Sequence, residues 1–194
     1  MPEKTKSIKN SEGEIKKYVN ERYLRNKDIL ANKKEEIEEM YKNKEKEFFL
    51  LSNKIFKKNP WPKGGYISYL SIFDFGPRFL EEKSFQIFAF DKKKMILFSI
   101  FHEILHFQFY DYCLKNYSKI FQRLDKEKGF FWDMSEVFNA VIQDSPEFQK
   151  IQGKIKNIGY PDHKEKIKIA SSFWNGDVDL WIEKYLENFS ISLS

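Results

Sequence analysis

The residues of this chain whose types and spacing can do chemistry are His102, Glu103 and His106, which form an H-E-x-x-H motif. On a helix, side chains four residues apart lie on one face, so the two imidazoles can bind one metal ion. The carboxylate between them lies about 100° round the helix from His102. It is therefore beside the metal, where it can accept a proton from water. The spacing predicts a zinc site with a general base next to it.

The sequence around the motif predicts a buried helix over residues 92–116. This stretch has no Pro or Gly, and nearly every face of it carries Ile, Leu or Phe. A helix that is apolar all round is a buried helix, and polar side chains inside it need partners. A core histidine bonded to a backbone carbonyl is the alternative interpretation. The spacing and the burial together favour a metal, and two of the three histidines of the chain are in the motif.

A catalytic zinc needs a third protein ligand and an open fourth position. Tyr112 stands where one known arrangement would place a third histidine, so we expect a carboxylate instead. Glu136 is the first candidate because a carboxylate on a helix is rigidly aimed, and Asp133 and Asp144 are its rivals. One stripe of the predicted helix contains Glu136, Asn139, Ala140 and Gln143. That stripe is either the solvated side of an amphipathic helix or a face turned to the metal.

At these residues the chain resembles the gluzincins, zinc peptidases that bind their metal through two histidines and a downstream glutamate. His102, Glu103 and His106 match, followed by Glu136 in a Ser-Glu-x-x-Asn sequence. The resemblance implies a Zn²⁺ cofactor, Glu103 as the general base and hydrolysis of peptide bonds. Such peptidases often use a downstream tyrosine or histidine to donate a proton or hydrogen bond in the transition state. The candidates for this role are Tyr160, His163 and Tyr110.

The predicted fold class is α+β. We expect a zincin-like domain, mostly helical, with a small twisted sheet packed against a backing helix and a buried active-site helix. A disordered N-terminus over 1–13 precedes the single domain at 14–194. Its predicted parts are the backing helix region 14–58, the small sheet at 66–90, the active-site helix 92–116, the glutamate helix 133–144 and the C-terminal helices in 145–194.

Two strands are predicted within the small sheet, over 66–75 and 84–90. The second runs directly into the active-site helix. If it is an edge strand beside the cleft, its backbone can pair with an extended peptide. If it is central, it has no free edge, and the sequence leaves both arrangements open.

The composition of the chain limits the classes of partner that it is expected to bind. The net charge of +5 comes from residues 1–58, but acids alternate with bases there, which is typical of a solvated helix and not of a nucleic-acid site. A single cysteine excludes an internal disulfide, and no apolar stretch predicts a signal peptide or a membrane span. We therefore expect a cytoplasmic protein that acts on a peptide or protein substrate, with no prediction of oligomeric state.

A second function remains open at this point. A non-catalytic zincin-like metal-binding module that binds a protein partner would carry the same motif. It would hold a structural zinc, or its cleft would be filled permanently, for example by the long N-terminal helix or by residues 191–194. Glu103 argues against this alternative, since a purely structural zinc site does not need that carboxylate.

Overall fold

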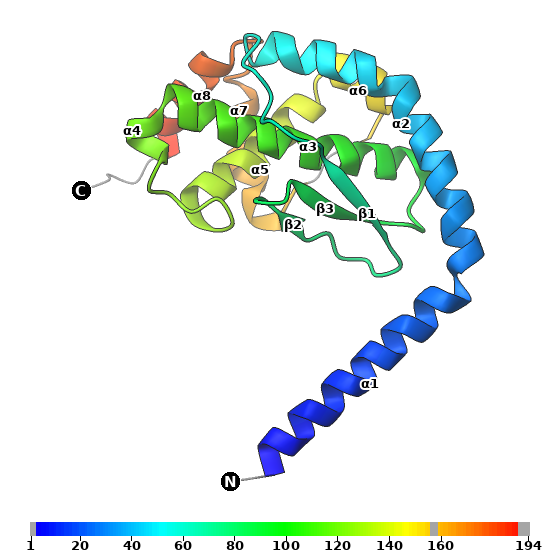
Figure 1. Cartoon of the computed structure of the whole chain (residues 1–194). Coiled ribbons are helices and arrows are strands. Elements are labelled where there is room, and N and C mark those ends of the chain that lie inside the picture. Colours follow the sequence, from blue (N-terminus) through cyan, green and yellow to red (C-terminus); the bar gives the residue numbers. More distant parts are fainter. Residues whose placement is uncertain (1–2, 156–158, 190–194) are drawn as a thin grey trace.

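The computed structural model describes residues 3–155 and 159–189, and these form a mostly helical chain with one small sheet. The predicted α+β class is confirmed at this level. In Figure 1, α3 runs through the middle of the molecule, with the sheet on one side of it and helices around the rest. The helices are α1 (Glu3–Arg25), α2 (Lys27–Ile55), α3 (Lys93–Asn116), α4 (Ser118–Phe121), α5 (Gly129–Gln143), α6 (Pro146–Gln152), α7 (Lys164–Ser171) and α8 (Val178–Phe189), with a 3₁₀ turn at Pro161–His163.

The sheet has three strands in the order β1-β3-β2, which are Ile67–Ser71, Ser84–Phe88 and Arg78–Phe79. β1 pairs in parallel with β3, and β2 pairs antiparallel with β3. β3 is therefore central, so the predicted strand over 84–90 has no free edge. The edge strand next to the active-site helix is β2. β2 could not be predicted from the sequence because two residues are too few to give a periodic pattern.

α3 is buried on nearly all sides, because it packs against α2, α5, α6 and β3. Aromatic rings fix these contacts. Phe101 of α3 stacks on Phe48 of α2 with ring centroids 4.3 Å apart, and Phe109 stacks on Phe138 of α5 at 4.5 Å. Stacked pairs add about 0.5–1.5 kcal/mol each to the burial of their surface. The rotation of α3 about its own axis is thus set by its neighbours on either side of the motif.

α5 begins at Gly129, four residues before the predicted start at 133. Asp133 and Ser135 consequently lie inside the helix. The apolar side of α5 packs Phe138 against Trp181 of α8, with ring centroids 5.0 Å apart. Its polar stripe is also buried, at 8% exposure for Glu136 and none for Asn139. The interpretation of that stripe as a solvated surface is therefore wrong.

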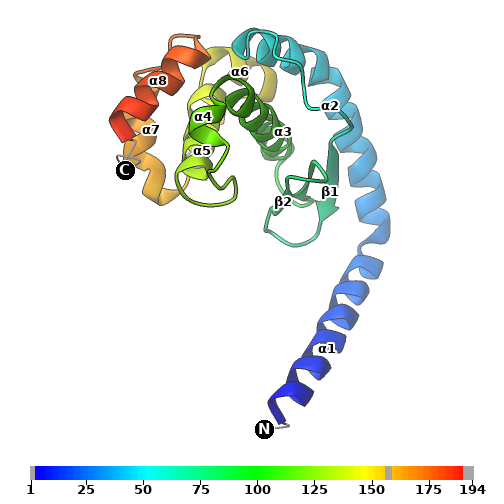
Figure 2. The same cartoon turned by 60° about the vertical axis from the view of Figure 1, so that its left-hand side comes forward.

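The N-terminal region forms two helices that meet at Asn26. α1 begins at Glu3, whereas the sequence predicted a disordered segment over 1–13. Lys and Glu, which are good helix formers, are frequent in this segment, and no proline follows Pro2. α2 is the predicted backing helix and buries Phe48 and Ile55. α1 projects away from the rest of the molecule in both views (Figures 1 and 2), so it does not cover the site described below.

The C-terminal region forms three short helices, α6, α7 and α8. α8 is held by Trp181, whose indole N–H donates to the carbonyl of Ala170 in α7 at 3.0 Å. α6 ends at Gln152, before Gly153. The suggestion that residues 191–194 cover the groove concerns residues outside the described part of the chain. None of the described helices has both the length and the apolar character required to span a membrane.

Candidate metal centre

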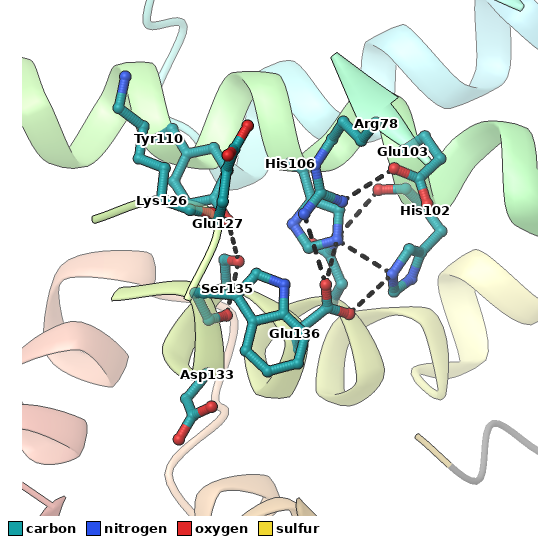
Figure 3. A network of polar contacts seen from close by, with 12 residues as sticks. Arg78, His102, Glu103, His106, Tyr110, Lys126, Glu127, Asp133, Ser135 and Glu136 are labelled. Atoms are coloured by element: carbon teal, nitrogen blue, oxygen red, sulfur yellow. Dashed lines mark hydrogen bonds and ion pairs between the residues drawn. The ribbon is translucent and has the colours of Figure 1, made fainter. Parts of the chain in front are cut away.

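α3 presents His102 and His106 on one face, as their spacing predicts. Their Nε2 atoms lie 3.0 Å apart, and the two rings are nearly perpendicular, at 82°. The His106 side chain is fully buried, while the His102 side chain is 18% exposed. The two Nε2 atoms point toward the same position, on the side of α3 that faces α5 (Figure 3).

α5 adds the carboxylate of Glu136 to this point. Its Oε2 lies 3.1 Å from Nε2 of His102, and its Oε1 lies 3.2 Å from Nε2 of His106. The three side chains form the group of metal-binding type found among the described residues. Tetrahedral ligands with zinc bonds of about 2.0–2.2 Å lie about 3.3–3.6 Å apart. The three side chains therefore fit a zinc ion after a shift of about a few tenths of an ångström.

The two rival carboxylates lie elsewhere. Asp133 accepts from His163 at 3.1 Å and from Lys166 at 2.6 Å, and Figure 3 shows it directed away from the two histidines. Asp144 is the C-cap of α5, where it accepts from Gln149 at 2.9 Å. Glu136 is thus the carboxylate that the fold brings to His102 and His106.

The polar stripe of α5 orients His102 from outside the triad. Gln143 Oε1 lies 2.8 Å from Nδ1 of His102, and its Nε2 donates to the carbonyl of Phe98 at 3.1 Å. Asn139 Nδ2 donates to the carbonyl of His102 at 2.9 Å. A bond from Nδ1–H to an amide oxygen leaves Nε2 as the free lone pair, which is the arrangement typical of metal-binding histidines. The periodicity of the sequence predicts both amides on this stripe but indicates no role for them.

The pKa values of the two histidines are shifted in opposite directions, although burial lowers both. Burial lowers the pKa of His106 to about 3, and the guanidinium of Arg78 acts in the same direction. His106 is therefore neutral, which is the form that binds metals. Burial also opposes a charge on His102, but the hydrogen bond and the charge of Glu136 outweigh it and raise the pKa of His102. The pKa of the Glu136 carboxyl lies well below its usual range because the two histidines outweigh its burial.

Glu103 has a partner that the sequence did not predict. Nη1 of Arg78, in the edge strand β2, donates to Oε2 of Glu103 at 2.8 Å, and Nη2 lies 3.5 Å from Oε1 of Glu136. The Arg78 side chain is only 11% exposed. No local signal marks Arg78 in the sequence, because its position depends on the pairing of β2 with β3.

The triad opens on a cleft of about 630 Å³ between β2 and the helices α3 and α5. Arg78, His102, Glu103 and Glu136 line one part of it, and Trp132, Tyr160 and His163 line another. Trp132 and Tyr160 lie with ring centroids 5.2 Å apart. The cleft gives an extended ligand access to both the proposed metal position and Glu103.

The three candidates for a transition-state donor differ in access. Tyr110 is buried, and its hydroxyl lies 2.6 Å from Ser135 Oγ and 2.8 Å from the carbonyl of Lys126. His163 is buried and bonded to Asp133. Tyr160 is 51% exposed and lines the cleft. Burial, followed by the charges of Glu136 and Glu103, raises the pKa of Tyr160, so its hydroxyl keeps its proton at neutral pH.

Comparison with known proteins finds no protein-family model, curated protein or solved structure that matches this chain. The chain is an α+β protein, mostly helical, with a buried helix that presents His102 and Glu103 at the wall of a cleft and His106 directly behind it.

Proposed function

We propose that this protein is a gluzincin-like zinc peptidase with a zincin-like fold. One observation carries the proposal. The Nε2 atoms of His102 and His106 lie 3.0 Å apart, each lies within 3.2 Å of one carboxylate oxygen of Glu136, and His102 and Glu136 line an open cleft. Glu103, the residue after the first histidine, lines the same cleft. A site built only for structure does not need an open side or an adjacent carboxylate.

The chemistry follows from these side chains. A zinc ion held by the triad would supply a Lewis acid that polarises the scissile carbonyl and lowers the pKa of water to about 7. Glu103 accepts a proton from the attacking water and passes it to the leaving amine. Gln143 holds the ring of His102 with Nε2 directed toward the other two ligands, and Asn139 ties α5 to the backbone of His102. The cytoplasmic location predicted from the sequence belongs to the same proposal.

The main alternative is a zincin-like metal-binding module that binds a protein partner without catalysis. The ion pair between Arg78 and Glu103 favours it, because Arg78 occupies one oxygen of the carboxylate that the proposed base requires. However, Arg78 contacts Oε2 of Glu103, and that leaves Oε1 for a proton. The two functions therefore predict the same metal content and differ in turnover.

A direct experiment tests the proposal. The purified chain is expected to contain about one zinc per chain by elemental analysis and to cleave bonds in a random peptide pool, as detected by mass spectrometry. A chelator should stop cleavage, and added Zn²⁺ should restore it, because the activity depends on the ion. Zinc without any cleavage would favour the binding module, and a chain that takes up no zinc would exclude both functions.

Tyr160→Phe tests the assignment of the transition-state donor. Removal of the hydroxyl is expected to lower kcat by about 100-fold and to leave KM within about twofold, because the lost interaction forms only in the transition state. Steady-state kinetics on a peptide from the pool measures both values. Tyr69→Phe is the matched control, since Tyr69 is also 51% exposed but lies on β1, outside the cleft. An unchanged kcat in Tyr160→Phe would exclude Tyr160 from this role.

A further inference from the structure

Among the described residues that line the cleft, Arg78 is the one Lys or Arg side chain, and it lies beside the proposed metal position. It comes from β2, the edge strand that borders the cleft, and its guanidinium reaches between Glu103 and Glu136 (Figure 3). An arginine this deeply buried needs acceptors, since burying an unpaired charge costs several kcal/mol. In the structure, the two carboxylates of the site are those acceptors.

The proposed peptidase gives both carboxylates other tasks. Glu136 becomes a metal ligand, and Glu103 must hold the attacking water. The contact from Nη2 to Glu136 is already long, at 3.5 Å, so this part of the guanidinium is the first to lose its partner. A guanidinium has five N–H donors, and its planar fork matches the two oxygens of a carboxylate. The N–H groups of Arg78 that no longer contact Glu136 are then free to bind a substrate in the cleft.

The charges of the site point to the same ligand. Glu103 and Glu136 balance the charge of a divalent metal ion, and Arg78 then leaves one positive charge in excess. Among the other described side chains that line the cleft, Trp132 and Tyr160 are neutral, and the carboxylate of Glu127 is exposed, where solvent screens its charge. The guanidinium of Arg78, which is only 11% exposed, therefore remains the charge that attracts an anionic group beside the triad. A carboxylate of the substrate neutralises that charge.

We propose that Arg78 is a specificity-determining residue that binds a carboxylate of the peptide substrate close to the scissile bond. This inference rests on the proposed peptidase function and deepens it. The carboxylate has two possible sources, the side chain of an Asp or Glu and the C-terminus of the peptide. Both present the same planar pair of oxygens, so peptides with an amidated or a free C-terminus are compared to distinguish the two sources.

The first measurement is equilibrium binding, so that it does not depend on turnover. Short N-acetylated peptides are titrated by calorimetry into the zinc-loaded chain in four forms. Two forms carry a carboxylate: one has an internal Glu and an amidated C-terminus, and the other has Gln at that position and a free C-terminus. The two neutral forms both have an amidated C-terminus, with Gln in one and Asn in the other. At least one carboxylate form is expected to bind about 10- to 100-fold more tightly than the neutral forms.

Arg78→Gln identifies the residue responsible. This variant is expected to lose the preference for the carboxylate, while its affinity for neutral peptides stays within about threefold of the parent. Arg78→Lys keeps the charge without the planar fork and should retain part of the preference. Arg123→Gln removes an exposed arginine outside the cleft and serves as the matched control. Zinc content and thermal melting confirm that each variant is loaded and folded, and Arg78→Lys carries the test if Arg78→Gln does not fold.

The outcomes separate the inference from the function on which it rests. Equal binding of acidic and neutral peptides would overturn the role of Arg78. A preference for the carboxylate that persists undiminished in both Arg78 variants would also overturn it, because the carboxylate would then bind the metal directly. Kinetics on the same peptides should show the preference mainly in KM. A chain that prefers carboxylates through Arg78 but cleaves nothing would retain the binding role and refute the peptidase.

Discussion

Glu103→Gln is expected to abolish peptide hydrolysis while zinc stays bound. The substitution keeps the size of the side chain and an oxygen that can accept from Arg78, but an amide cannot accept the proton of the attacking water. Loss of a general base lowers the rate by about 10²–10⁴-fold. Elemental analysis for zinc and kcat/KM on a peptide from the pool measure the two effects in one preparation.

Glu127→Gln is the control for this result. Glu127 also lines the cleft but is exposed, and the same change there removes one negative charge without touching the triad. We expect kcat/KM to stay within about twofold of the parent, because exposed charges are well screened. If Glu103→Gln cleaves peptides as fast as the parent, Glu103 is not the base.

Loss of zinc is the second large effect, and we expect it in His102→Ala and in His106→Ala. Each change removes a metal ligand, and the remaining groups no longer surround the ion. The affinity for zinc should fall by more than the roughly 10- to 100-fold that the loss of an outer-shell partner costs. Zinc content per chain after dialysis, followed by competition with a chelator of known affinity, measures it. Glu136→Ala should weaken binding as well.

His163→Ala is the matched control for the ligand variants. His163 is buried like His106 and lines the same cleft, but its Nε2 is bonded to Asp133, outside the triad. It should keep the zinc content of the parent. Parental zinc affinity in Glu136→Ala would return Asp133 or Asp144 to consideration, and parental affinity in both histidine variants would refute the site.

The local features of the site could be predicted from the sequence. The i, i+4 spacing of His102 and His106 sets their common face on any helix, whatever surrounds it. The absence of Pro and Gly and the apolar residues on every side predicted a buried helix over 92–116, and α3 spans Lys93–Asn116. Glu136 was preferred over Asp133 and Asp144 because of its place on a helix, and the fold brings it to the histidines.

Other features depended on contacts between distant segments. Periodicity gave α5 one apolar and one polar face, but it cannot distinguish a face turned to water from a face turned to the polar groups of α3. The buried bonds of Asn139 and Gln143 follow from the packing of the two helices. Similarly, the sequence could not rank Tyr110, His163 and Tyr160 as donors in the transition state. The fold buries Tyr110 and His163 and leaves Tyr160 in the cleft.

The sequence by itself thus determined which side chains share a helix face, because helix geometry is local and repeats every 3.6 residues. Only the tertiary structure decided which strand is at the sheet edge and which cation reaches Glu103. Arg78 enters the site through the pairing of β2 with β3, opposite Phe85, and this register is fixed by contacts between strands. A strand of two residues is too short to show a periodic pattern in the sequence.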